Sequence, residues 1–323
     1  MKAKLITVIP VYNGAEFILQ TLQSVAAQTL RPDRVIVQDN RSTDNTEELV
    51  KGFKSINCEW RQNEKNLGWL GNANRGLEYA TETNYLHLLC ADDLIRPAFY
   101  ERLTGALESC NGLGLGYSLD ERIDENNQRL SISGKLTGRV EVQTKEDFLR
   151  EKAEIANQAI SASLLKTAYQ KAPCQFNADF PSLADMIFWG DWGRHCKKIV
   201  RIHDTLAAFR WHGANNSDVF VLKLQDLVLD EWRGMQFLEQ LRGATSGFIR
   251  QFKLKGLFAV RSGIKAKRFR QNNNCAYASQ ISNAARGISG PLAWYLARAL
   301  VEARDLAIYK IGRRPRHRKN IFS

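Results

Sequence analysis

The first 95 residues alternate between short apolar runs and segments with helical character. Apolar runs at residues 5–9, 34–38 and 84–89 are typical of strands. Residues 15–27 place apolar side chains three and four positions apart, as a helix with one buried face does, and residues 71–80 are expected to form another helix. Strands and helices that alternate at this spacing form right-handed parallel crossovers, so the chain is expected to form a doubly wound α/β sheet.

The last of these strands ends in two adjacent carboxylates, Asp92 and Asp93. In open α/β folds, ligands bind at the edge of the sheet where the strands end. Two neighbouring carboxylates repel each other unless a cation lies beside them, and such oxygen-rich sites suit Mg²⁺ or Mn²⁺. An aspartate at this position can equally cap the following helix, so the pattern alone leaves metal binding and capping open.

The middle of the chain departs from the simple alternation. Residues 112–142 are rich in Gly, Ser and Asn in short alternating segments, which favours antiparallel strands and loops added to the sheet. Residues 145–169 are expected to be mostly helical. A further helix is expected to start within residues 182–189, with Asp185 in its first turns, and a strand over residues 206–212 is expected to end in His212.

Beyond about residue 218 the pattern is helical throughout. Leu292, Leu296 and Leu300 recur at helical spacing, with charged residues on another stripe. We therefore expect an α/β domain over residues 1–217 and a helical region over residues 218–323.

The positive charge of the chain is concentrated near its end. The formal net charge is +12, and from Arg250 onward there are 17 Lys and Arg against 2 acidic residues. A basic segment of this kind suggests an anionic partner. An anionic membrane surface and a solvated helix face with a loose basic end at residues 313–319 are the two main interpretations. Nucleic acid is not the expected partner, because the segment contains no known recognition module.

Cysteine usage and hydropathy bear on the compartment. The six cysteines show no C-x-x-C pair, which argues against a zinc site or a disulfide framework and favours a reducing compartment. The apolar run near the start is short for a signal peptide, and no stretch of about 18 apolar residues suggests a transmembrane helix. We expect a cytoplasmic protein, peripheral on the inner face of the membrane if the basic segment binds lipid.

Five motifs in order resemble the family 2 glycosyltransferases, which are inverting, nucleotide-sugar-dependent enzymes of the GT-A fold. Residues 8–13 (V-I-P-V-Y-N) are similar to the family's first strand and nucleotide loop, and residues 37–44 (V-Q-D-N-R-S-T-D) to its V-V-D-D-G-S-T-D segment. Residues 66–68 and 74–76 resemble its N-x-G and R/N-N-x-G stretches. Residues 89–93 (L-C-A-D-D) stand where the family has L-D-A-D-D. The resemblance covers residues 5–217 and implies the GT-A fold.

The resemblance also implies roles for individual residues. Asp92, Asp93 and His212 would hold Mn²⁺ or Mg²⁺, with His212 in a segment similar to the family's Y-R-x-H. The general base would be Asp185, in a segment similar to E-D-x-x-L-W, with Asp191 as the alternative. Nucleotide-sugar binding is implied for Pro10, Tyr12, Asn13, Asp39, Asn66, Gly68, Asn74 and Asp92. Asp39, His212 and Asp185 each also fit a purely structural role, as a turn aspartate, a strand histidine and a helix-start carboxylate.

Four positions depart from the family pattern, and one of them is Ala73, which stands where a basic residue is common. Cys90 replaces the first aspartate of the D-x-D triplet, which predicts weaker or different metal binding. Asn40 replaces the second aspartate of the D-D pair, and Arg41 replaces a glycine.

The expected function is the inverting transfer of a sugar from a UDP, dTDP or GDP donor to a glycan or lipid-linked acceptor, in cell-envelope polysaccharide assembly. Two alternatives stay open: a catalytically silent homologue that binds nucleotide or a partner, and a nucleic-acid binder that acts through its basic tail.

Overall fold

The computed structural model describes residues 3–154, 158–212, 224–243, 247–271 and 273–310. The chain forms two compact units, Met1–Gly213 and Ala214–Ser323. The predicted end of the α/β domain at residue 217 and the basic cluster at 313–319 lie outside the described residues.

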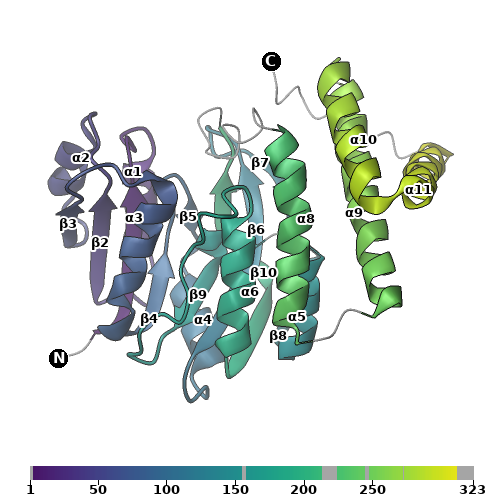
Figure 1. Cartoon of the computed structure of the whole chain (residues 1–323). Helices are drawn as coiled ribbons and strands as arrows, with labels where there is room; N and C mark the ends of the chain where they lie inside the picture. Colours follow the sequence, from purple (N-terminus) through teal and green to yellow (C-terminus); the bar gives the residue numbers. More distant parts are fainter. Residues whose placement is uncertain (1–2, 155–157, 213–223, 244–246, 272, 311–323) are drawn as a thin grey trace. The chain divides into compact units, whose positions relative to one another are not determined.

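The first unit is built on one mixed ten-stranded sheet (Figure 1). Eight strands follow the order β3-β2-β1-β4-β9-β6-β10-β5, with β7 paired to β6 and β8 paired to β10. The strands are β1 Ala3–Val11, β2 Arg34–Asp39, β3 Cys58–Gln62, β4 Thr83–Leu88, β5 Leu94–Ile95, β6 Gly114–Ile123, β7 Arg129–Ile132, β8 Val140–Gln143, β9 Ser163–Lys166 and β10 Lys198–Arg210.

Strands β1 to β4 are mutually parallel where they pair, as the alternation of the sequence predicts. β9 runs antiparallel to both of its neighbours, β4 and β6, and β10 is parallel to β6. The carboxyl ends of β1, β2, β4, β6 and β10 therefore share one edge of the sheet, and β9 starts at that same edge. The predicted α/β sheet, mostly parallel and flanked by helices, is confirmed.

Helices cover both faces of this sheet. The helices are α1 Ile18–Ala26, α2 Thr46–Gly52, α3 Gly68–Leu77, α4 Phe99–Leu107, α5 Lys145–Ala153 and α6 Ala184–His195. Successive residues of β1 point to opposite faces: Leu5 and Ile9 pack with α1, α2 and α4, whereas Ile6 and Val8 pack with α3, α5 and α6. Because both faces are covered, β1 is a continuous apolar run rather than an alternating one.

Two local predictions need correction. Residues 145–169 are not mostly helical: α5 ends at Ala153, a 3₁₀ turn follows at Ile160–Ala162, and Ser163–Lys166 forms the central strand β9. All four residues of β9 are buried between β4 and β6, so this strand carries no alternation that would mark it. The strand predicted over residues 206–212 is part of a longer one, because β10 runs from Lys198 to Arg210, with two register shifts against β6, and ends before His212.

The second unit is helical in its described part. Its helices are α8 Leu224–Leu241, α9 Phe248–Gln271, α10 Cys275–Ser289 and α11 Pro291–Lys310. α11 buries Trp294, Ala297 and Val301, whereas Leu292, Leu296 and Leu300 are exposed. The apolar stripe seen in the sequence is therefore the outer side of α11. None of the helices in the described part is both long and apolar enough to cross a membrane.

Candidate active site

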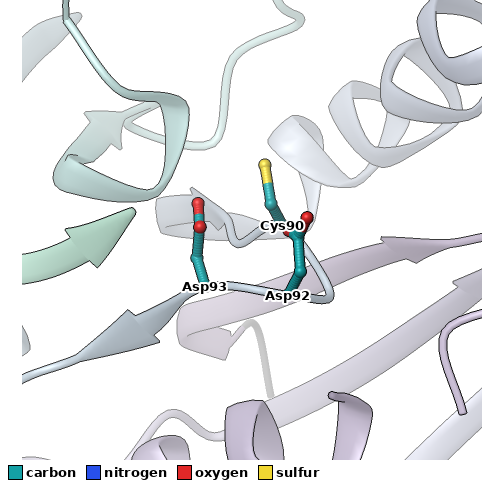
Figure 2. Close-up of side chains that lie close together, drawn as sticks. All are labelled: Cys90, Asp92 and Asp93. Carbon is teal, nitrogen blue, oxygen red and sulfur yellow. The ribbon is translucent and has the colours of Figure 1, made fainter. Parts of the chain in front are cut away.

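The tandem aspartates lie on a tight turn directly after β4, at the edge of the sheet where the parallel strands end. The turn is closed by the Asp93 N–H, which donates to the Cys90 carbonyl at 3.2 Å. The hydroxyl of Thr21 on α1 lies within hydrogen-bonding distance of the carbonyls of Ala91 and Asp93, at 2.8 and 2.9 Å. Helix α1 thus holds the turn in place. Figure 2 shows the side chains of Cys90, Asp92 and Asp93 on this turn.

Asp93 is the buried member of the pair, with 1% of its surface exposed. One carboxylate oxygen accepts the hydroxyl of Ser161 at 2.6 Å, and the other accepts the backbone N–H of Arg210 at 2.9 Å. Burial raises the pKa of Asp93 well above its ordinary value, and the neighbouring charge of Asp92 raises it further. Asp93 is therefore held by the 3₁₀ turn that precedes β9 and by the last residue of β10. Its environment disfavours a negative charge unless a cation compensates it.

Asp92 is the more accessible member, and its carboxylate meets His212. The distance from Asp92 Oδ2 to His212 Nε2 is 3.0 Å. Arg210 donates from Nε to the Asp92 carbonyl at 2.7 Å and lies with its guanidinium 4.6 Å from the ring centroid of Phe17. The His212 ring packs on the same Phe17 ring at 4.9 Å. The structure thus brings Asp92, Asp93 and His212 together, with His212 reaching the cluster through Asp92.

The residues of this turn fit a divalent cation. The Cys90 sulfur and one carboxylate oxygen from each of Asp92 and Asp93 all lie within 4.8 Å of one another. Burial raises the pKa of the Cys90 thiol, and the charges of Asp93, Asp92 and Asp185 raise it further. A positive ion would stabilise the charged forms of Cys90 and Asp93, which burial and the neighbouring carboxylates disfavour.

Asp185 opens helix α6, as the sequence predicts. It is close enough to the tandem-aspartate turn to raise the pKa of Cys90, and burial raises the pKa of Asp185 itself. Asp191 lies almost two turns further along α6, where it pairs with Arg194 at 2.5 Å. The next residue, Trp192, donates to the carbonyl of Gly114 at the start of β6. Asp191 therefore lies toward the opposite edge of the sheet from Asp92.

Asp39 ends β2 and is fully buried. Its carboxylate accepts hydrogen bonds from the N–H groups of Arg41 and Ser42 at 3.1 Å each, from the Ser42 hydroxyl, and from Gln62 Nε2 at 2.9 Å. This is the geometry of a turn aspartate. A nucleobase N–H would have to share an oxygen that already has partners, so base recognition by Asp39 stays a prediction.

The loop after β1 is joined to the loop after β2. Asn13 adopts a left-handed backbone conformation with φ of 51°, and its side-chain oxygen accepts the Thr43 N–H at 2.8 Å. The Asn13 N–H donates to Ser42 Oγ at 2.8 Å. Pro10 is paired with Gln38 within the sheet, and Tyr12 is half-exposed. Of these predicted nucleotide-binding residues, Tyr12 offers an open aromatic surface at the sheet edge.

Asn40 organises the predicted nucleotide residues that follow β3. Its Nδ2 donates to Asn66 Oδ1 at 2.8 Å and to the Gly68 carbonyl at 3.2 Å. Its Oδ1 accepts from Asn63 Nδ2 at 3.0 Å and from the Leu67 N–H at 2.8 Å. A carboxylate could not donate the first two bonds. The asparagine that departs from the family pattern is thus explained by the loop that it holds.

Asn74 on α3 has a structural role in this fold. Its Nδ2 donates to the Phe176 carbonyl at 3.1 Å, and its Oδ1 accepts the Phe176 N–H at 2.8 Å. These two hydrogen bonds connect α3 to the segment that precedes α6, the helix that carries Asp185.

Three residues that contribute to the site were not found from the sequence: Ser161, Arg210 and Lys152. Ser161 and Arg210 hold the tandem aspartates, but each lies more than 60 residues from Asp93 in the sequence. Lys152 is buried on α5, with its Nζ 5.0 Å from the ring centroid of Phe148. Its positive charge lowers the pKa of Asp185, against the larger effect of burial. In the sequence Lys152 is one of several charged residues of α5, so nothing marks it as the buried one.

The mixed sheet of the first unit, with its helices on both faces, has the fold of solved GT-A structures. S. aureus TarS, solved in complex with UDP-GlcNAc, superposes with a TM-score of 0.57 at 16% identity, over 88% of this chain and 92% of that chain. The mannosyltransferase PcManGT from Pyrobaculum calidifontis, in complex with GDP-Man and Mn²⁺, has a TM-score of 0.55 at 15% identity, over 97% of this chain and 83% of that chain. At these identities the likeness concerns the fold.

Sequence relationships identify the family. Residues 7–166 match the family model of glycosyl transferase family 2. An uncharacterized glycosyltransferase of Haemophilus influenzae is 27% identical over 220 residues, 65% of this chain and 66% of the relative. Escherichia coli YibD, also an uncharacterized glycosyltransferase, is 35% identical over 107 residues, 32% of this chain and 31% of the relative. The matched region thus spans just under two thirds of the Haemophilus relative. The chain belongs to glycosyl transferase family 2, a family of inverting enzymes.

Proposed function

We propose that this protein transfers a sugar from a nucleoside diphosphate donor, a UDP-, dTDP- or GDP-sugar, to a glycan or lipid-linked acceptor with inversion. The observation that carries the proposal is the convergence of Cys90, Asp92 and Asp93 with Asp185 at one edge of a family 2 fold. Neighbours of the same fold bind UDP-GlcNAc and GDP-Man, which supports a nucleotide-sugar donor.

In this proposal Asp185 is the general base. The carboxylate takes the proton of the acceptor hydroxyl as its oxygen bonds to the anomeric carbon, and the bond from that carbon to the nucleoside diphosphate breaks. Burial raises the pKa of Asp185, which makes its carboxylate a stronger base than an exposed aspartate. The residue lies in the first turn of α6, on a regular element that fixes its position.

Asp92 and Asp93, with His212 beside them, would hold Mn²⁺ or Mg²⁺ in this proposal. When bound, the cation would neutralise charge on the departing diphosphate. Arg210 keeps both aspartates in place, through its N–H to Asp93 and its Nε to the Asp92 carbonyl. Tyr12 and the loops held by Asn13 and Asn40 would line the nucleotide.

The second unit suggests how a lipid-linked acceptor could be approached. On α11, Leu292, Leu296 and Leu300 are 69, 54 and 63% exposed, and the sequence from Arg250 onward is strongly basic. An exposed apolar helix face with basic surroundings binds anionic bilayer surfaces. We place the protein on the cytoplasmic side of the membrane, in cell-envelope polysaccharide assembly. Co-sedimentation with phosphatidylserine vesicles should exceed that with phosphatidylcholine vesicles, and a variant with Leu296→Glu and Leu300→Glu should lose the difference.

The catalytic assignment is tested by comparing two conservative variants. Release of nucleoside diphosphate is measured from UDP-GlcNAc and GDP-mannose, with Mn²⁺ and a lipid extract as acceptor source. Asp185→Asn should lower the rate by about 100-fold or more, while nucleotide affinity measured by calorimetry stays unchanged. Asp191→Asn should keep the wild-type rate. Full activity in the Asp185 variant, or loss only in the Asp191 variant, would reject the assignment.

The same assay addresses the silent-homologue alternative. A chain that binds UDP or GDP in the presence of Mn²⁺, yet releases no diphosphate with any donor or acceptor source, would favour a binding role over catalysis.

A further inference from the structure

The metal site contains one side chain that the family pattern does not supply, the thiol of Cys90. We propose that Cys90 is itself a ligand of the bound cation, so that this site prefers thiophilic divalent cations such as Co²⁺, Zn²⁺ and Cd²⁺ over Mg²⁺. The inference rests on the proposed function, because it takes the cation site at Asp92 and Asp93 as given.

The first argument is geometric. The Cys90 sulfur and the two carboxylate oxygens lie within 4.8 Å of one another, and Figure 2 shows all three side chains on the same short turn. Ligand atoms bound to one tetrahedral ion at about 2.0–2.3 Å lie roughly 3.5 Å apart. The three atoms are therefore close enough for side-chain rotations to bring them onto a shared ion.

The second argument is that the protein holds the cysteine in this position. The hydroxyl of Ser161 accepts the Cys90 N–H at 3.0 Å and donates to Asp93 Oδ2 at 2.6 Å. One hydroxyl therefore fixes both the backbone of the cysteine and the carboxylate of the aspartate. Supporting hydrogen bonds of this type orient metal ligands in known sites.

The third argument is that Cys90 differs from the other cysteines in its surroundings. Cys90 is the only one of the six cysteines that belongs to a cluster of three potential ligand side chains at this spacing, within the part of the chain that the structure describes. Cys110, Cys174 and Cys196 are buried, and Cys275 is exposed on α10. A thiol-dependent metal signal can thus be traced to one residue by substitution.

The chemistry follows from the donor set. Mg²⁺ takes oxygen ligands almost exclusively and keeps several waters, so a sulfur donor contributes little to its binding. Thiolates bind borderline and soft cations strongly, and coordination displaces the thiol proton to the buffer. A site with one sulfur and two carboxylates should therefore rank Cd²⁺, Zn²⁺ and Co²⁺ above Mn²⁺, and Mn²⁺ above Mg²⁺.

The test is a Co²⁺ titration of the full-length protein under anaerobic conditions, followed by absorption spectroscopy. Wild-type protein should develop a sulfur-to-cobalt charge-transfer band in the near ultraviolet. Cys90→Ser should lose this band and bind Cd²⁺ about 10-fold more weakly or worse, with Mg²⁺ affinity little changed. Cys90→Asp should also lose the band but bind Mg²⁺ more tightly than the wild type does. Cys275→Ser is the matched control and should keep the wild-type band.

Two results would overturn the inference: Co²⁺ bound without a charge-transfer band, or a band that survives in Cys90→Ser. Circular dichroism and the melting temperature establish that each variant is folded. The proposed function is tested separately by nucleotide binding. If UDP or GDP still stabilises the protein in a metal-dependent way, only the role of Cys90 fails. If no cation binds and no nucleotide stabilises the protein, both fail.

Discussion

Restoring the family's usual residue at position 40 should destabilise this chain. In Asn40→Asp, the oxygen that replaces Nδ2 cannot donate to Asn66 Oδ1 or to the Gly68 carbonyl, which now lie 2.8 and 3.2 Å from the substituted atom. Asn40 is 2% exposed, so the new carboxylate is also removed from water. Each lost hydrogen bond costs about 0.5–1.5 kcal/mol, and a buried group without a partner costs about 1–3 kcal/mol. We expect the free energy of unfolding to fall by about 2–4 kcal/mol at pH 7.

The pH dependence of this loss distinguishes the mechanism from general disruption. Burial should raise the pKa of the new carboxyl above its unfolded value of about 3.9. Above that pH the unfolded chain binds fewer protons than the folded chain, so the penalty should grow as the pH rises and shrink below about pH 4. Urea unfolding at several pH values measures this loss of unfolding free energy, with Asn57→Asp, at an exposed position, as the matched control. A loss below about 1 kcal/mol, or one that does not change with pH, would refute the reasoning.

Two further predictions concern packing and the environment of Asp185. A Cβ at Gly76 would lie 2.7 Å from Leu88 Cδ2 and 3.2 Å from Val8 Cγ1, so Gly76→Ala should destabilise the protein by about 1–3 kcal/mol in urea unfolding. Gly105→Ala is the control, because its Cβ meets nothing within 4 Å, and it should be neutral or stabilising. Equal effects of the two substitutions would contradict the packing argument. Burial lowers the pKa of Lys152 to about 7, so the unfolded chain binds more protons than the folded one between about pH 7 and pH 10. The free energy of unfolding should therefore rise over this range by up to about 1.4 kcal/mol per pH unit, relative to that of Lys152→Met. If the two proteins show parallel profiles of unfolding free energy against pH, Lys152 stays charged in the folded chain and the prediction is wrong.

The sequence was sufficient for the frame of the first unit because buried parallel strands are continuous apolar runs. β1, β2 and β4 stand out in this way, and the polar residues that follow them meet at one edge because the strands are parallel. This is why Asp92 and Asp93 could be placed at that edge without a structure.

Strand β9 could not be found by the same reasoning. It has four residues, all buried between two neighbours, so it shows neither the length nor the alternation that periodicity detects. Missing β9 also meant missing Ser161, which lies just before it and holds Asp93. The role of Arg210 could not be predicted either, because its bond to Asp93 depends on where β10 ends relative to β4.

The amide network around Asn40 shows a different limit. From the sequence, Asn40 is a departure from a family aspartate and suggests an altered pocket. In the structure it is a donor to Asn66 and Gly68 and an acceptor from Leu67. Side-chain hydrogen bonds between residues that are 26 to 28 positions apart leave no periodic trace, so only the folded arrangement explains the substitution.

The most direct test of the account is the melting temperature with UDP, GDP, dTDP or CMP, each in Mn²⁺, Mg²⁺ or EDTA, for the wild type and Asp92→Asn. A ligand that binds only the folded state raises stability with its concentration. We predict that one diphosphate stabilises the wild type in a metal-dependent way and that Asp92→Asn loses this stabilisation. No stabilisation by any nucleotide, or the same metal-dependent shift in Asp92→Asn, would contradict a nucleotide-sugar site at the tandem aspartates.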